Sequence, residues 1–258
     1  MIKNKIISPF FISILILMVV LNHFSAIGIG YFIAVILVWF LIVLWGSFVI
    51  SSNYHVKSLC GNSLEKLKII ALTFDDGPNE NTLLVLDLLK KYDAKATFFC
   101  IGKNIEKYSE IVQRTIAEGH IVGNHSYSHS HFFDFFRKEK LIDELEKTDV
   151  LLEQFTAKKI SLFRPPYGVT NPSIRRALAF TKHQVIGWNI RSLDGVVKDE
   201  KLLYDRIVKR VAPGGIVLLH DTSKHSVNVL EQLLQFLQNN NYTVVSLEQL
   251  LNIKAYAN

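Results

Sequence analysis

The sequence predicts an α/β fold: a closed or nearly closed (β/α) barrel of about seven parallel strands, preceded by an N-terminal transmembrane helical hairpin. Two patterns predict the barrel. After residue 66, apolar strand-like runs alternate with amphipathic helical runs, and this alternation implies parallel strands covered by helices. Polar clusters follow several of these strands, and (β/α) barrels carry their chemistry at the carboxyl ends of the strands. A long uncharged N-terminal run predicts the hairpin.

The N-terminal segment contains no Lys, Arg, Asp or Glu from Ile6 to Ile50, about 45 residues. This length is more than twice the ~20 residues that one helical span requires. An interruption at Asn22–Ser25 predicts two spans, about residues 7–21 and 29–50, joined by a short turn. We therefore expect a multi-pass protein of the cell membrane, in contact with the lipid bilayer.

Basic residues lie on both sides of this segment: Lys3 and Lys5 precede it, and Lys57, Lys66 and Lys68 follow it. The turn between the two spans has neither Lys nor Arg, so the positive-inside rule favours both termini, and the folded domain, on the cytoplasmic face. Two alternatives place the domain outside: a single span, or a cleaved signal peptide. No small-x-small cleavage site follows the first apolar stretch.

The chain divides into a membrane segment at residues 1–52, a linker at 53–66 and a folded domain at 67–258. Within the folded domain, seven apolar runs are expected to form strands: Ile69–Phe74, Ala96–Ile101, His120–Gly123, Ser161–Arg164, Gln184–Trp188, Ile216–His220 and Thr243–Ser246. Six amphipathic runs are expected to form helices: Asn81–Tyr92, Ile105–Glu118, Lys138–Phe155, Pro172–Phe180, Lys201–Val211 and Val227–Asn240.

Charge and cysteine content narrow the function classes. The net charge is +6, but the Lys and Arg residues are scattered, so no nucleic-acid partner is expected. The two cysteines are far apart, and Cys100 lies in an apolar run, which favours a core thiol over a disulfide with Cys60.

The most informative cluster is the pair Asp75 and Asp76, which ends an apolar strand and precedes a Gly-Pro turn. Adjacent carboxylates raise each other's pKa unless a cation sits beside them, so a metal ion is expected here. The alternative is an ordinary Asp-Asp-Gly turn, which needs no ligand. A second cluster contains His125 and His129, which a helical turn would point the same way. Two His and one carboxylate are a standard ligand set for catalytic zinc.

Three further clusters follow later strands. In Arg164-Pro-Pro-Tyr-Gly168, two prolines stiffen a loop beside an arginine that can pair with a carboxylate. The run Trp188-Asn-Ile-Arg-Ser-Leu-Asp194 ends in an acid, and His220 closes a fully apolar strand. A lone histidine there is more often structural, but the other strand ends favour an acid or base role.

These clusters resemble, in order, the five motifs of the polysaccharide deacetylase family, the NodB-homology domain of carbohydrate esterase family 4. The motifs appear as Thr73-Phe-Asp-Asp-Gly-Pro78, His125-Ser-Tyr-Ser-His129, Arg164-Pro-Pro-Tyr-Gly168, a degenerate Trp188…Asp194, and Leu218-Leu-His220. The match runs from about Leu67 to Leu251. It implies a distorted (β/α) barrel and the metal-dependent removal of N-acetyl groups from amino sugars.

The resemblance also implies roles for the residues. Asp76, His125 and His129 would hold a divalent metal, with Zn²⁺ as the first expectation and Co²⁺ or a similar ion as an alternative. Asp75 would be the general base, Arg164 would orient Asp75, and His220 would be the general acid. The backbone N–H of Tyr167, after Pro166, would stabilise the oxyanion. Successive side chains diverge in an extended backbone, so one aspartate can bind metal while its neighbour acts as base.

The fourth motif departs from the family pattern of two acids followed by Trp, because Arg191 takes the first acidic position and Gly195 follows Asp194. The partner of His220 is therefore open between Asp194 and Asp221, and the acyl group need not be acetyl. The expected substrate is an amino-sugar glycan, such as peptidoglycan, or a glycolipid at the cytoplasmic face. A non-catalytic glycan-binding protein and a hydrolase of a non-sugar amide are the alternatives.

Overall fold

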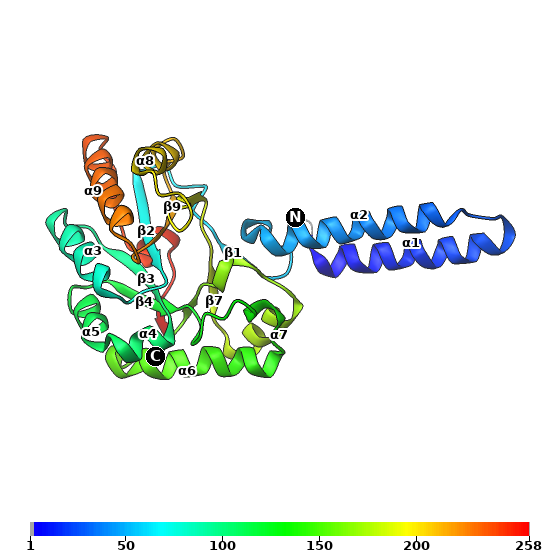
Figure 1. The fold of residues 1–258 in the computed structure, drawn as a ribbon, viewed down its shortest axis with the longest axis horizontal. Helices are drawn as coiled ribbons and strands as arrows, with labels where there is room; N and C mark the ends of the chain where they lie inside the picture. The colour runs from blue at the N-terminus through cyan, green and yellow to red at the C-terminus, as the bar shows by residue number, and fades with distance from the viewer. Residues whose placement is uncertain (1–2, 258) are drawn as a thin grey trace.

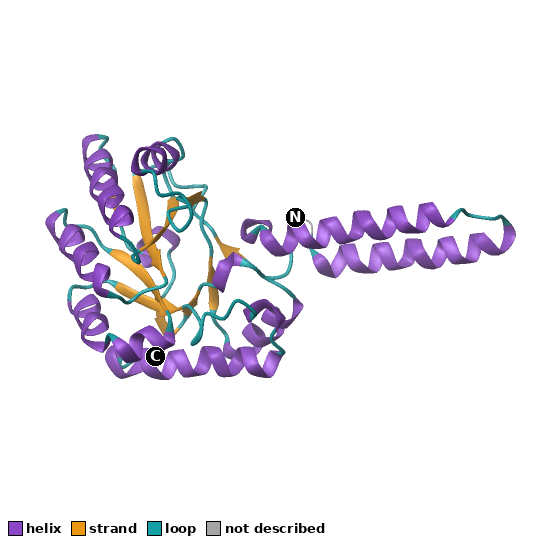
Figure 2. Cartoon of the chain, in the orientation of Figure 1, coloured by secondary structure: helices purple, strands orange, loops and turns teal. Residues whose placement is uncertain are grey.

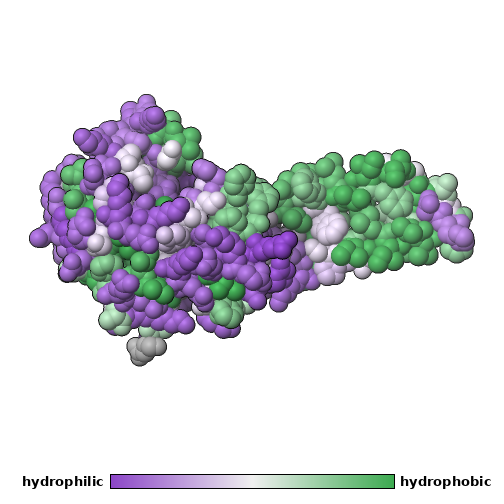
Figure 3. All heavy atoms as spheres, turned by 60° about the horizontal axis from the view of Figure 1, so that its bottom comes forward, coloured by the Kyte–Doolittle hydropathy of each residue, from purple (hydrophilic) through white to green (hydrophobic). Residues whose placement is uncertain are grey.

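The computed structural model describes residues 3–257 and contains a folded α/β domain with a long apolar arm (Figure 1). The arm consists of α1 (Asn4–Phe24) and α2 (Ile29–Phe48), which run antiparallel and match the two predicted spans. Their lengths of 21 and 20 residues, together with their composition, would allow each to cross a membrane. Phe11 and Trp39 stack between them, with ring centroids 6.1 Å apart. The visible face of the arm is almost entirely hydrophobic apart from its tip (Figure 3).

A curled parallel sheet forms the centre of the domain, with strand order β1-β7-β6-β4-β3-β2-β9-β8 and β10 paired to β2. The strands are β1 (Ser58–Leu59), β2 (Ile69–Asp75), β3 (Ala96–Cys100), β4 (Ile121–Asn124), β6 (Leu162–Phe163), β7 (Gln184–Ile186), β8 (Ile190–Arg191), β9 (Gly215–His220) and β10 (Thr243–Val244). The end strands β1 and β8 do not pair in the described chain, so the barrel is incomplete. The predicted fold class is confirmed.

Helices cover the outer face of this sheet (Figure 2). They are α3 (Glu80–Lys91), α4 (Gly102–Lys107), α5 (Ser109–Ala117), α6 (Lys138–Thr156), α7 (Pro172–Thr181), α8 (Glu200–Val208) and α9 (Lys224–Asn239). Helix α10 (Leu247–Leu251) packs on the opposite face, where Leu247 and Leu250 are buried with Ala71 and Phe99. Sequence signals mark several starts. Asn79 and Thr82 form a reciprocal capping box on α3, and Asn171 caps α7 ahead of Pro172. Each of the six helices expected in the domain is present, one of them divided into α4 and α5.

Several short elements were not expected from the sequence. Strand β1 lies inside the segment 53–66 that the sequence predicts as a linker, and it pairs with β7. Strand β8 follows β7 after only three residues. A small antiparallel sheet joins β5 (Lys159–Ile160) to β11 (Tyr256–Ala257). Single 3-10 turns are η1 (Ile50–Ser52), η2 (Phe133–Phe135) and η3 (Pro166–Gly168).

The arm is attached to the domain through specific contacts. The side chain of Ile50 is buried in a cluster with Phe163 and Val185 of the domain. A β-carbon on Gly46 would lie 2.3 Å from the Tyr54 ring, so only glycine lets the chain fold back against α2 here. The backbone N–H of Asn4 donates to the Tyr54 carbonyl at 3.0 Å, which joins the start of α1 to the same loop. The base of the arm and the domain are therefore packed as one unit.

Candidate active site

The carboxyl ends of the central strands bring the predicted residues to one edge of the sheet. Strands β2 and β9 are in register, with Asp75 directly opposite His220. On the other side of β2, β3 pairs with β4, which leads into His125. Neighbouring parallel strands thus place the first, second and fifth sequence clusters together, as expected for this architecture.

A fully buried arginine holds Asp75. The Arg164 guanidinium is 0% exposed, and its Nη1 donates to Asp75 Oδ1 at 2.7 Å and to Thr73 Oγ1 at 2.8 Å. Its Nε donates to the Ile186 carbonyl at 3.1 Å, and its Nη2 donates to the Gly187 carbonyl at 3.0 Å. Burial lowers the pKa of Arg164, and Asp75 opposes this effect. Each of the three guanidinium nitrogens donates at least one hydrogen bond, so Asp75 has a fixed orientation and a permanent positive partner.

Asp76 points toward two histidines. Its backbone is left-handed, with φ of 72°, which turns its side chain away from that of Asp75. Asp76 Oδ1 lies 3.4 Å from His125 Nε2 and 3.2 Å from His129 Nε2. Burial raises the pKa of Asp76, but His125, His129 and His220 together outweigh burial and hold that pKa far below its ordinary value.

The expected helical turn between the two histidines is wrong. Residues 125–129 form an irregular loop with left-handed backbone at Ser126 and His129, where φ is 65° and 47°. The imidazoles converge nonetheless, with ring centroids 4.9 Å apart. The side chain of Asn124 shapes this loop, because its Oδ1 accepts the Ser126 N–H at 2.8 Å.

These residues fit a divalent metal. Ligand atoms of Asp76, His125 and His129 all lie within 4.8 Å of one another. Asp76 Oδ1 is buried and has no hydrogen-bond partner in the described part of the chain, an expensive state that a cation would relieve. His125 Nδ1 donates to the Arg164 carbonyl at 2.7 Å, which leaves the Nε2 lone pair facing Asp76. Burial and His125 lower the pKa of His129 to about 4, so His129 is a neutral ligand.

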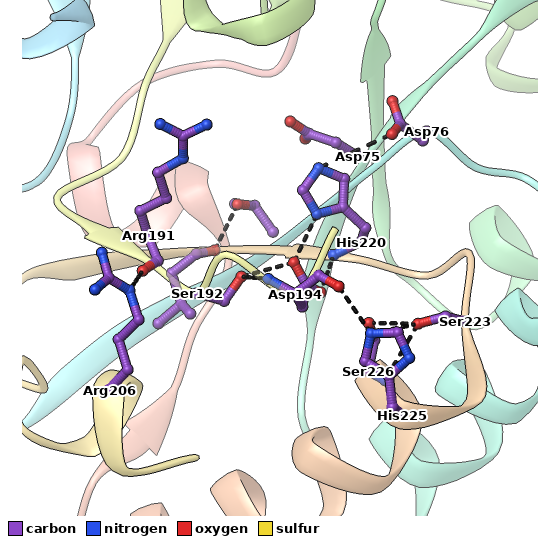
Figure 4. Close-up of polar contacts among 12 residues, drawn as sticks. Asp75, Asp76, Arg191, Ser192, Asp194, Arg206, His220, Ser223, His225 and Ser226 are labelled. Carbon is purple, nitrogen blue, oxygen red and sulfur yellow. Dashed lines mark hydrogen bonds and ion pairs between the residues drawn. The ribbon is translucent and has the colours of Figure 1, made fainter. Parts of the chain in front are cut away.

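His220 pairs with Asp194 (Figure 4). His220 Nδ1 lies 2.7 Å from Asp194 Oδ1, and the His220 N–H donates to Asp194 Oδ2 at 2.8 Å. Burial lowers the pKa of His220, but Asp194, with Asp75 and Asp76, outweighs burial and raises it to about 9. The opposite ring nitrogen, Nε2, faces Asp76 Oδ2 at 3.9 Å. His220 is therefore a protonated imidazole beside the candidate metal site.

Asp221 is not the partner of His220. Its side chain is fully buried, accepts a hydrogen bond from Thr82 Oγ1 at 2.6 Å and contacts Asn79 Nδ2 at 3.4 Å. A β-carbon on Gly77 would lie 2.4 Å from Asp221 Oδ2, so the Gly-Pro turn packs directly on this carboxyl. Burial raises the pKa of Asp221 to about 7. Asp221 joins β9 to the start of α3 and supports the turn after the aspartate pair.

These side chains line a cavity of about 240 Å³. The walls include Tyr167, Trp188, Leu193 and Leu218, and Arg191 lies on the rim with its guanidinium 5.8 Å from the Trp188 ring. Figure 4 shows the Arg191 side chain extended away from Arg206, whose Nε donates to the Arg191 carbonyl at 3.0 Å. Tyr167 follows Pro166 in η3 and has left-handed backbone, with φ of 59°.

All nine predicted site residues lie in or directly behind this cavity, and the structure adds others. Ser192 Oγ donates to Asp194 Oδ1 at 2.7 Å, and His225 Nε2 lies 2.7 Å from the Asp194 carbonyl (Figure 4). Thr73 bonds Arg164 and is two residues before Asp75 on the same face of β2, a spacing that could have identified it. Ser192 and His225 carry no such signal.

Comparison with known proteins identifies the family. The polysaccharide deacetylase family model matches residues 64–186. The chain is 34% identical over 187 residues to a peptidoglycan-N-acetylglucosamine deacetylase of Bacillus cereus, covering 68% of this chain and 67% of that protein. The chain belongs to the polysaccharide deacetylase family. The family and this relative confirm the predicted enzyme class, a hydrolase of amide bonds.

Two further polysaccharide deacetylase relatives show how far this likeness extends. The peptidoglycan-N-acetylmuramic acid deacetylase PdaC of Bacillus subtilis is 35% identical over 188 residues, which are 72% of this chain but only 39% of that protein. The solved PdaC chain superposes with a TM-score of 0.68 at 32% identity, covering 72% of this chain and 91% of the solved one. BA3943 of Bacillus anthracis, described as a pseudoenzyme of carbohydrate esterase family 4, has a TM-score of 0.69 at 26% identity, covering 76% and 69%. The fold alone therefore does not establish activity.

Proposed function

We propose that this protein removes N-acetyl groups from amino-sugar residues of a peptidoglycan-type glycan and is anchored to the membrane by α1 and α2. One observation carries the proposal. A base held by a buried arginine and a protonated acid held by a carboxylate lie beside an Asp-His-His ligand set in one cavity. A base, an acid and a metal site are together the components of metal-assisted amide hydrolysis.

Asp76, His125 and His129 would hold the metal, with Zn²⁺ favoured by the two imidazoles and one carboxylate. When bound, the metal would polarise the acetyl carbonyl and make water more acidic. Asp75 then accepts a proton from the water that attacks the carbonyl carbon, while Arg164 keeps Asp75 oriented toward it. The Tyr167 N–H is assigned to the developing oxyanion.

The second half of the reaction needs a proton for the leaving nitrogen. The carbon–nitrogen bond breaks as His220 Nε2–H gives its proton to the amine, and acetate and the free amino sugar are the products. The pairing of His220 with Asp194 keeps the imidazole protonated at neutral pH and directs Nε2 toward the cavity. In the degenerate fourth motif, Asp194 therefore supplies the partner that Arg191 cannot.

Acetate release from a panel of substrates tests the proposal: peptidoglycan, chitooligosaccharides, lipid-linked amino sugars and an N-acetylated amide without a sugar, each with the metal-free protein and with added Zn²⁺ or Co²⁺. Metal-dependent release from peptidoglycan supports it. Metal-dependent release from a non-sugar amide alone would indicate a related hydrolase. Failure to release acetate from any substrate, in a folded protein that binds Zn²⁺, would favour the non-catalytic alternative, for which BA3943 is a structural precedent.

A second candidate substrate is a lipid-linked amino sugar at the cytoplasmic face. One observation favours it: Lys3, Lys5 and Lys57 lie at the domain end of the arm, and short basic flanks favour the cytoplasmic side. Protease treatment of intact spheroplasts separates the two candidates. A domain cleaved without lysis supports the external glycan, and a domain cleaved only after lysis supports the cytoplasmic substrate.

A further inference from the structure

A second cavity, of about 620 Å³, lies at the base of the arm, away from the catalytic residues. It is formed where the start of α1, the loop after α2 and helix α7 meet. Its lining residues are Lys3, Lys5, Asn53, Tyr54, His55, Val56, Lys57, Ser58 and Arg175. Its volume is within the range of small-ligand sites.

The cavity is strongly cationic. Lys3, Lys5, Lys57 and Arg175 all line it, and none of the described residues that line it is acidic. No ion pair involves these four residues within the described chain, unlike Lys91, Arg114 or Lys201, which pair with carboxylates. Four unpaired positive charges around one cavity favour an anionic ligand.

Two buried polar groups in the lining also lack partners. His55 and Ser58 are each only 5% exposed, yet His55 Nδ1 and Ser58 Oγ have no hydrogen-bond partner in residues 3–257. The other ring nitrogen of His55 contacts Ser47 Oγ at 3.1 Å. Burial and Arg175 lower the pKa of His55 to about 4, so the ring is neutral. Buried polar atoms without partners are rare, and an anion bound in this lining would supply acceptors for such groups.

The position of the cavity identifies the source of the anion. Lys3 immediately precedes α1, and Asn53–Ser58 follow the end of α2 at Phe48. The cavity thus lies where both apolar helices end, which is the level of the lipid headgroups if the arm spans a bilayer. Figure 3 shows strongly hydrophilic surface beside the base of the apolar arm.

We propose that this cavity binds the phosphate headgroup of an anionic phospholipid from the bilayer that holds α1 and α2, and that this binding fixes the domain at the membrane surface. The proposal rests on the proposed membrane anchoring and does not depend on catalysis. Lysines that only set the orientation of the helices in the membrane would lie beside the helix ends, but they would need neither a cavity nor buried polar groups without partners.

The test uses the full chain in phosphatidylcholine nanodiscs with increasing fractions of phosphatidylglycerol, and native mass spectrometry counts the lipids that stay bound after extraction. Each basic residue near an anionic surface contributes roughly fivefold in affinity, so Lys57→Gln with Arg175→Gln is expected to weaken phosphatidylglycerol retention by about 25-fold. The matched control, Lys90→Gln with Arg210→Gln, removes two exposed charges near α3 and α8 and should retain wild-type binding.

Ser58→Ala distinguishes a specific binding site from general electrostatic attraction to an anionic membrane, because it leaves every charge of the protein in place. We expect it to weaken retention by about tenfold, the loss of one hydrogen bond to a charged group. Equal retention of both lipids by the wild type, or an unaltered Ser58→Ala variant, overturns the proposal. Displacement of the lipid by free glycerol phosphate overturns the lipid assignment. Incorporation into pure phosphatidylcholine discs measures anchoring separately, so a failure of anchoring is distinguishable. Lys57→Arg with Arg175→Lys keeps the charge and should retain binding.

Discussion

The pairing of Asp194 with His220 predicts a specific change in pH dependence when Asp194 is replaced by Asn. Asp194 accepts hydrogen bonds from His220 Nδ1 at 2.7 Å, from the His220 N–H at 2.8 Å and from Ser192 Oγ at 2.7 Å. Burial lowers the pKa of His220, and Asp194 is the largest of the groups that oppose burial and bring the pKa to about 9, against a usual 6.5. This difference corresponds to about 3 kcal/mol of preference for the protonated form.

The sign follows from the role of His220. A general acid must carry its proton, so activity that depends on His220 is present below its pKa and is lost as the pH rises through it. In the wild type this alkaline limb is expected near pH 9. Without the Asp194 charge the pKa falls toward or below 6.5, because burial is then less opposed, and the limb moves down by about 2 units.

The assay is acetate release across the pH range, with kcat and KM determined separately. At pH 8 we expect Asp194→Asn to lower kcat by about 10- to 30-fold, because a pKa near 6.5–7 leaves roughly 3–10% of His220 protonated there. Asp221→Asn is the matched control, because Asp221 is adjacent to His220 in sequence but bonds Thr82 instead. An Asp194→Asn variant whose alkaline limb coincides with that of the wild type would refute the assignment of Asp194.

Three further predictions follow from the same geometry. Arg164→Met removes the guanidinium that hydrogen-bonds buried Asp75, so we expect a loss of about 3–5 kcal/mol in unfolding free energy by urea titration. A loss below about 1 kcal/mol would show that the neighbouring histidines are sufficient partners for Asp75. Burial raises the pKa of Asp221 from 3.8 to about 7, so the free energy of unfolding falls as the pH rises through that interval and Asp221 ionises. Asp221→Asn should remove this fall and raise the free energy of unfolding by up to about 4 kcal/mol at pH 8. A variant with the pH–stability curve of the wild type would contradict this prediction. Arg191 lies on the cavity rim without an acidic partner in residues 3–257, so Arg191→Gln should raise KM for glycans that carry a carboxylate and leave KM for neutral chitooligosaccharides unchanged. An equal rise in KM for both substrates would contradict a role of Arg191 in binding the substrate carboxylate.

Much of the fold could be predicted from the sequence because its long elements carry periodic signals. The uncharged run to Ile50 indicates the hairpin, and each strand expected in the domain is present. Strands β1 and β8 were missed because polar residues flank both of them, whereas the equally short β6 and β10 coincide with the apolar runs at 161–164 and 243–246. Segment 53–66 is mostly polar, and this composition predicts a linker although Ser58 and Leu59 within it pair with β7.

The residues of the site could be predicted where they directly follow strands, because parallel strands place their carboxyl ends at one edge of the sheet. The identities of Asp75, Asp76 and His220 followed from their positions after apolar runs. The sequence could not decide whether Asp194 or Asp221 is the partner of His220, because this depends on the path of the loop that connects β8 to the following elements beside β9. The loop geometry at His129 was likewise wrong, since left-handed backbone at non-glycine residues leaves little trace in sequence.

The most direct test of the proposed chemistry compares acetate release by the wild type and by Asp75→Asn, both loaded with Zn²⁺ and both shown to be folded and to bind one equivalent of metal. Asp75 is placed as the base but not as a metal ligand, so the substitution should leave metal content unchanged and lower kcat by about 100- to 10,000-fold. Wild-type acetate release from Asp75→Asn would contradict the account.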